Sequence, residues 1–142
     1  MKLLINIEIS LNAPAIKVWE ALTNSRWTKQ YMYGYEVSSG WKTGDSILWR
    51  TTINGKQHIR KGKVLLAQPY EVLEISDFNP NSGLEDIDTN YQKVTYHLLS
   101  QDDKTTLLRV TDDYAGDEKR HTESNQFWNA VLPKLKEVIE RK

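Results

Sequence analysis

The sequence predicts an α+β fold, in which one long C-terminal helix crosses the face of an antiparallel sheet. Three observations support it. Alternation of apolar and polar residues recurs near the N-terminus and again over about residues 35–112. Turn-forming residues separate the alternating segments. Residues 117–140 then carry a continuous apolar stripe with a 3.6-residue period, which is typical of a helix packed on a core.

The first elements are one strand and two short helices. The alternating run over residues 4–9 predicts a half-buried strand. Pro14 suits the first turn of a helix predicted over 15–23, because that position needs no backbone N–H. Ser25 is expected to cap a second helix, over 26–32.

The remaining strands are joined by short turns, which predicts an antiparallel arrangement. Asn54-Gly55 is a strong two-residue hairpin signal, because both central positions need positive φ. Turn residues at 79–83 and 101–104 end two further strands. Together with the first strand we expect six or seven strands; the later ones span about residues 46–51, 56–67, 72–78, 91–100 and 105–112.

The C-terminal helix changes character along its sheet-facing side. Trp128 and Val131 lie on the apolar part of this side, and the same line continues through Ser124, His121 and Asp117 toward the helix start. A tunnel with a polar mouth and an apolar interior would have this pattern. The alternative is that the first turns extend beyond the sheet into solvent.

Aromatic residues are biased toward types with a polar edge, since the chain has five tryptophans and seven tyrosines but two phenylalanines. Trp27 and Tyr31 are four residues apart and share one face of the second short helix. With Trp49, Tyr96 and Trp128 they could form the wall of one pocket. The alternative is that they are ordinary core residues.

Composition excludes several classes of protein. The 19 basic and 19 acidic side chains argue against a nucleic-acid or anionic-membrane binder. The absence of cysteine excludes disulfide scaffolds and thiolate metal sites. The opening segment MKLLINIEISLNAP lacks the apolar stretch of a signal peptide or membrane span. We therefore expect one cytoplasmic domain over residues 1–142 that does not insert into membranes.

No local motif for a metal, a cofactor or catalysis stands out. His58, His97 and His121 are too scattered to form a local metal motif. The acidic segment 85–90 departs from a calcium loop and is interpreted as solvated. Alternation puts Lys61 and Lys63 of the basic cluster at residues 60–63 on one face of a strand and Arg60 on the other, so an outer sheet surface is expected rather than a phosphate cradle. Spacing selects no catalytic pair among the carboxylates Asp45, Glu74 and Asp77.

Spaced motifs run through nearly the whole chain. They are Ile9-x-x-x-Ala13-Pro14, Val18-Trp19-Glu20-Ala21-Leu22-Thr23, Trp41-x-x-Gly44-Asp45, Trp49, Gly62-Lys63-Val64, Pro69, Val94-Thr95-Tyr96-x-Leu98 and Trp128-x-x-x-Leu132-x-x-Leu135-Lys136. In this order they resemble the activator of heat-shock-protein-90 ATPase homologue family, which belongs to the SRPBCC (START-like) superfamily. The motifs are specific for the fold and weak for function, because most are packing and turn positions.

The resemblance implies a helix-grip fold, in which a curved antiparallel sheet wraps around the C-terminal helix and leaves a cavity beneath it. Family members typically hold hydrophobic or amphipathic small molecules there, so ligand binding is the first functional hypothesis. The expected lining residues are Trp27, Tyr31, Trp49, Tyr96, His121, Ser124, Trp128 and Val131.

Two other functions stay open. A cavity enzyme of the cyclase, aromatase or hydrolase type would use His58, His121 or Asp117 as its acid–base group. A co-chaperone-like regulator of the ninety-kilodalton heat-shock protein is the third hypothesis, although the sequence starts at the first strand without a separate chaperone-binding domain. No cofactor is expected, and the chain is expected to be a monomer or a homodimer.

Overall fold

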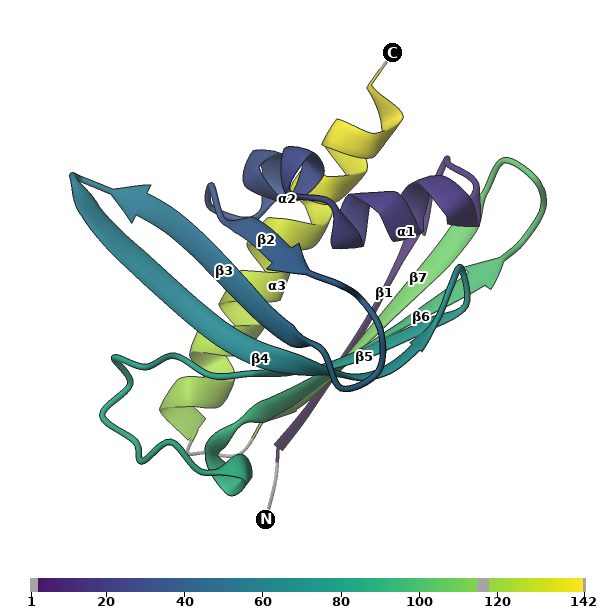
Figure 1. Cartoon of the computed structure of the whole chain (residues 1–142). Helices are drawn as coiled ribbons and strands as arrows, with labels where there is room; N and C mark the ends of the chain where they lie inside the picture. Colours follow the sequence, from purple (N-terminus) through teal and green to yellow (C-terminus); the bar gives the residue numbers. More distant parts are fainter. Residues whose placement is uncertain (1–2, 115–117, 142) are drawn as a thin grey trace.

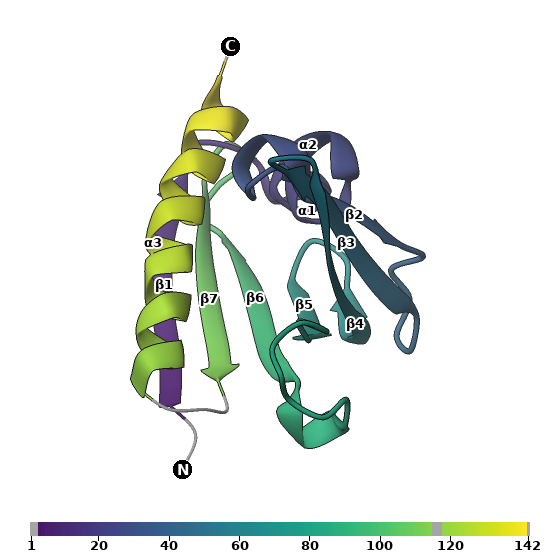
Figure 2. The same ribbon diagram turned by 90° about the vertical axis from the view of Figure 1, so that its left-hand side faces the viewer.

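Seven antiparallel strands form one curved sheet in the computed structural model, which describes residues 3–114 and 118–141 (Figure 1). The strand order is β1-β7-β6-β5-β4-β3-β2. The strands are β1 (Leu3–Leu11), β2 (Glu36–Ser39), β3 (Ser46–Ile53), β4 (Lys56–Gln68), β5 (Val72–Asp77), β6 (Gln92–Ser100) and β7 (Thr106–Tyr114). The helix α3 (Glu118–Glu140) runs along the concave side, beside β1 and β7 (Figure 2). This arrangement confirms the predicted helix-grip fold.

Two short helices, α1 (Ala15–Thr23) and α2 (Ser25–Tyr31), close one end of the sheet. The expected cap is wrong by one residue: the Asn24 side chain, not Ser25, accepts from the backbone N–H of Arg26, at 2.9 Å. Asn24 is the extended residue between the helices, whereas Ser25 is already helical. Pro14 precedes α1 and its carbonyl accepts from Val18 N at 3.1 Å.

The predicted hairpin between β3 and β4 is confirmed by its backbone. Asn54 and Gly55 have φ values of 52° and 78°, as a two-residue turn of this kind requires. Farther along β4, the backbone of β5 passes very close to Gly62. A Cβ atom at this position would lie 1.8 Å from the carbonyl oxygen of Ser76, so only glycine fits without moving a strand.

The core lies between the concave face of the sheet and one side of α3. Trp128, Val131 and Leu135 are buried on that side of the helix, as its apolar stripe predicts. The C-terminal end of α3 is held to β1 by polar contacts, among them Lys136 Nζ donating to the Ser10 carbonyl at 2.9 Å. None of the described helices is long and apolar enough to cross a membrane.

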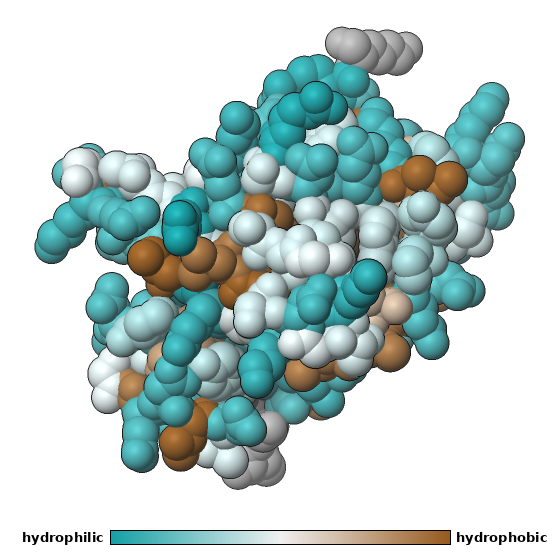
Figure 3. All heavy atoms as spheres, in the orientation of Figure 1, coloured by the Kyte–Doolittle hydropathy of each residue, from teal (hydrophilic) through white to brown (hydrophobic). Residues whose placement is uncertain are grey.

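Hydrophilic side chains cover most of the face shown in Figure 3, and the apolar ones gather in a few small groups.

The predicted start of the long helix, Asp117, lies outside the described residues.

Candidate functional site

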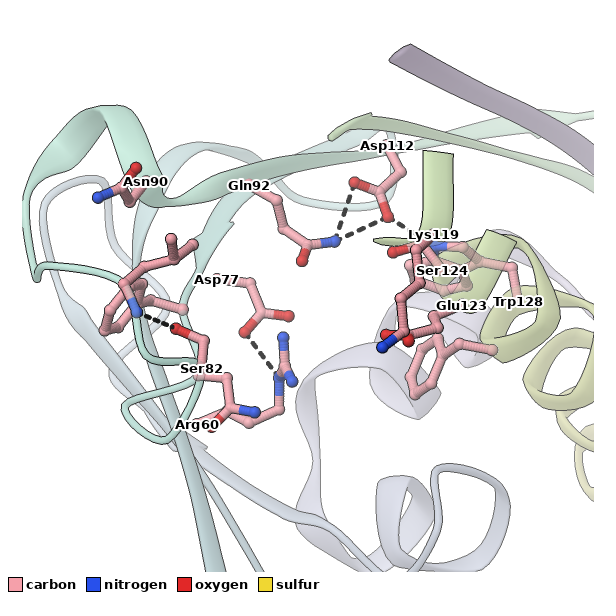
Figure 4. A pocket seen from close by; sticks show the side chains of 14 residues that line it. Arg60, Asp77, Ser82, Asn90, Gln92, Asp112, Lys119, Glu123, Ser124 and Trp128 are labelled. Atoms are coloured by element: carbon pink, nitrogen blue, oxygen red, sulfur yellow. Dashed lines mark hydrogen bonds and ion pairs between the residues drawn. The ribbon is translucent and has the colours of Figure 1, made fainter. Parts of the chain in front are cut away.

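A cavity of about 570 Å³ lies between the first half of α3, the loop 78–91 and strands β4 to β7. Its lining is mixed in chemistry, with charged, amide, hydroxyl and aromatic side chains (Figure 4). The lining residues are Arg60, Asp77, Phe78, Asn79, Ser82, Leu84, Asn90, Gln92, Asp112, Lys119, Glu123, Ser124, Phe127 and Trp128.

Four adjacent strands each place one polar side chain on the floor of this cavity. We call Arg60, Asp77, Gln92 and Asp112 the polar row. Asp77 and Gln92 are direct partners in the β5–β6 register, and Arg60 Nε donates to Asp77 Oδ1 at 2.9 Å. The row therefore crosses the sheet from β4 to β7 as two bonded pairs, Arg60 with Asp77 and Gln92 with Asp112, which lie next to each other in the register.

Asp112 is the most unusual member of the row because it is fully buried. Gln92 Nε2 donates to both of its carboxyl oxygens, at 3.0 and 2.9 Å, and Trp128 Nε1 donates to Oδ2 at 2.9 Å. Burial raises the pKa of Asp112 from 3.8 to about 6, although the hydrogen bonds from Trp128 and Gln92 and the charge of Arg60 lower it in part. Asp77 adds a further increase by charge repulsion.

A second, smaller space of about 30 Å³ shares Arg60, Asp77, Phe127 and Trp128 with the cavity. Its other lining residues are mainly apolar: Met32, Tyr35, Trp49, Ile75, Val94 and Tyr96. The Trp128 ring packs edge-on against Tyr96, with ring centroids 6.0 Å apart. The site is thus polar toward its opening and apolar toward the core, with Trp128 between the two parts.

Four of the eight predicted lining residues come together here. Ser124 and Trp128 line the larger cavity, while Trp49, Tyr96 and again Trp128 line the smaller space. Their role in ligand binding stays a prediction.

The other four predicted residues are not among the described residues lining either space. Tyr31 is buried, and its hydroxyl donates to the Ala21 carbonyl at 2.7 Å. Trp27 contacts neighbouring α1, where its Nε1 donates to Glu20 at 3.2 Å. Val131 lies in the core, and His121 is half-buried on α3.

Of the three candidate acid–base residues of an enzyme, Asp117 lies outside the described residues and the two histidines are placed elsewhere. His58 lies on β4 and, like His121, does not occur in the described lining of the cavity. Within residues 3–114 and 118–141, no group of three or more histidine, aspartate or glutamate side chains is arranged to hold a metal ion.

Sequence reasoning considered Asp77 and the cluster containing Arg60 but missed Gln92 and Asp112, although the sequence carries a signal for Asp112. Asp112 continues the alternation of the buried residues Leu108 and Val110, so it had to face inward. Asp77 follows Ile75 in the same way. A charged residue in phase with a buried apolar row is rare and points to a site.

Arg60 and Lys61 face opposite sides of β4, as the alternation of the basic cluster predicts, but the outer-surface expectation does not hold for Arg60. Arg60 is in phase with buried Gly62, and its ion pair with Asp77 holds it on the concave face. Lys61 points the other way, to the loop, where its ammonium group pairs with Asp86.

A family model described as Activator of Hsp90 ATPase homolog 1-like protein matches residues 12–140. The chain belongs to this family. The resemblance inferred from the spaced motifs is therefore confirmed, and the family places the cavity within a known type of fold. No curated protein matches the chain.

Solved structures agree with the family assignment. ChR145 from Cytophaga hutchinsonii is 36% identical over 99% of this chain and 95% of its own, with a TM-score of 0.82. CV1439 from Chromobacterium violaceum is 17% identical over 98% of both chains, with a TM-score of 0.81. The Aha1 dimer from Colwellia psychrerythraea is 19% identical over 97% of this chain and 96% of its own, with a TM-score of 0.74. The last two likenesses concern the fold alone.

Proposed function

We propose that this protein binds an amphipathic small molecule in the cavity between α3 and the sheet. The observation that carries the proposal is the cavity itself, in which a row of buried and half-buried polar groups faces an aromatic wall. Its volume of about 570 Å³ falls within the usual range of roughly 300–1,000 Å³ for small-molecule sites. The apolar part of a ligand would pack on Phe127 and Trp128, and its polar part would meet the polar row.

The polar row supports a binding role because burying its polar groups costs free energy. Burying charged and amide groups stabilises a protein only when every partner is in place, and apolar residues would serve the fold as well. Here Arg60 is paired with Asp77, and Asp112 accepts from neutral donors. Such a set orients a ligand by a few polar contacts, which is how small-molecule sites obtain specificity.

A cavity-filling variant tests the proposal. Ser124→Trp places a large ring in the cavity, whereas Asn129→Trp adds the same ring at an exposed position of α3 outside the described lining. Calorimetric titration with 2-naphthol is expected to show saturable binding that Ser124→Trp weakens at least tenfold and Asn129→Trp leaves within twofold. Native mass spectrometry of protein purified from its own host is expected to detect a bound small molecule. A mass spectrum without any bound small molecule, together with no saturable heat from 2-naphthol, contradicts the proposal.

A cavity enzyme is the second candidate, favoured by the pKa of about 6 for a carboxyl group at the cavity floor. In this alternative the acid–base group is Asp112 rather than His58 or His121. The amide of Gln92 is bonded to both carboxyl oxygens of Asp112, so a substrate would bond to the carboxyl group only after Gln92 moves. If a compound that copurifies with the protein is converted, Asp112→Asn is expected to abolish turnover while retaining binding; unchanged turnover contradicts this role.

The chaperone hypothesis rests on the name of the family to which the chain belongs. A pull-down with the ninety-kilodalton heat-shock protein, followed by its ATPase assay, separates this role from ligand binding. Stimulation that persists in Ser124→Trp would favour a chaperone role independent of the cavity.

A further inference from the structure

Gln92 is the member of the polar row whose amide group bonds to both carboxyl oxygens of Asp112. An ionised carboxyl group can only accept hydrogen bonds, so the two contacts of Asp112 with Gln92 require the amide nitrogen to face it. Figure 4 shows the consequence: the amide nitrogen of Gln92 points at Asp112, and its carbonyl oxygen is turned away from that carboxyl group. Gln92 therefore presents an acceptor, not a donor, to the cavity.

Trp128 supplies a second hydrogen-bond donor to Asp112. Its indole N–H also donates to Asp112, so the carboxyl group receives donors from β6 and from α3. The charged groups around Asp112 are Asp77 on β5 and Arg60 on β4, and Arg60 is itself paired with Asp77.

The described lining has a small excess of carboxyl groups. Lys119 and Glu123 line the cavity from α3, so the described lining holds two cationic groups against three carboxyl groups when Asp112 is ionised. A negative site with an exposed carbonyl acceptor complements a ligand that donates hydrogen bonds.

We propose that the Gln92 carbonyl, held toward the cavity by Asp112, recognises the ligand, which therefore belongs to the amphipathic molecules that present a hydrogen-bond donor such as a hydroxyl or an amine. This inference rests on the proposed function. Gln92 is the contact residue and Asp112 is a positioning residue. When Asp112 takes up a proton, it can donate to the Gln92 carbonyl; the amide then turns over and presents N–H to the cavity.

Asp112→Asn imitates the protonated state without changing the shape of the side chain. The carbonyl oxygen of the substituted side chain can accept from Trp128, and its amide nitrogen then donates toward Gln92, which turns the Gln92 N–H toward the cavity. The preference of the site should reverse. Asp86→Asn is the matched control, because Asp86 is an exposed carboxylate outside the described cavity lining.

The test uses two uncharged probes of similar size at pH 8: indole, which donates through its N–H, and quinoline, which accepts through its ring nitrogen. NMR titration of the wild type is expected to favour indole about fivefold, the effect of one hydrogen bond. Asp112→Asn is expected to favour quinoline, and Asp86→Asn to behave as the wild type. Indole should also bind more weakly at pH 5 than at pH 8 in the wild type, but not in Asp112→Asn.

Each outcome decides a separate claim. Saturable binding of both probes without a preference, or a preference that Asp112→Asn leaves unchanged, overturns the recognition by Gln92 and leaves the proposed function standing. No saturable binding of either probe counts against both the recognition by Gln92 and the proposed function. The orientation is also measured without ligand, as a nuclear Overhauser contact between the Gln92 amide protons and the Trp128 indole proton at pH 8. Its absence in the wild type overturns the inference.

Discussion

Asp112 makes the stability of the folded protein depend on pH in an unusual direction. Its pKa rises from 3.8 to about 6 on folding, chiefly because the side chain is buried. The folded state therefore holds this proton more tightly than the unfolded state, and ionisation of Asp112 destabilises the fold. The gap between the two values corresponds to about 3 kcal/mol, which is lost as the pH rises from below 3.8 to above 6.

Replacing the carboxyl group with an amide removes this dependence. Asp112→Asn cannot ionise, so its stability relative to the wild type should improve by about 3 kcal/mol between pH 3.5 and pH 7.5. Urea unfolding of both proteins across this range measures the difference directly, because the other titrating groups are common to both and cancel.

An exposed carboxylate provides the control. The hydrogen bond from Lys61 lowers the pKa of Asp86, so this group stabilises the fold at neutral pH and loses that contribution as the pH falls. Asp86→Asn should therefore show a dependence of the opposite sign. If the curves for the wild type and Asp112→Asn run parallel across the range, Asp112 does not have the raised pKa on which the reasoning depends.

Three further substitutions, one of them a control, test the fold and the site. Gly62→Ala should cost about 3 kcal/mol or more in urea unfolding, because its Cβ meets the Ser76 carbonyl at 1.8 Å. Gly55→Ala should cost only about 1–2 kcal/mol, because its Cβ has no neighbour within 4 Å and only its positive φ is strained; equal costs would argue against the steric explanation. Trp128→Phe removes the N–H donated to Asp112 and should cost about 1.5–3 kcal/mol at pH 8 and less at pH 4. A cost that does not change with pH would mean that the hydrogen bond to the ionised carboxyl group contributes little.

The order of elements was predictable because it rests on local patterns. The two-residue period of the strands, the Asn54-Gly55 turn and the 3.6-residue stripe of α3 are each visible within a short window. Capping was harder to assign, because Asn24 and Ser25 are both good cap residues and adjacent in sequence.

The site was only partly predictable, for a physical reason. Ser124 and Trp128 share a face of one helix, so their spacing alone brings them to one side. Arg60, Asp77 and Asp112 come from three strands, and their meeting depends on strand register. In the sequence, each of these three residues taken alone resembles an ordinary surface charge. The signal available for predicting the site was the alternation that places Asp112 in phase with its buried neighbours.

An NMR titration of isotope-labelled protein with 2-naphthol tests the central claim most directly, because it shows where a small molecule binds. We expect saturable shifts at the side-chain N–H groups of Gln92 and Trp128 and at the backbone of Ser124, with Trp27 unaffected. Shifts spread over the outer surface, or centred on Trp27 with the cavity unchanged, would contradict the assignment of this cavity as the binding site.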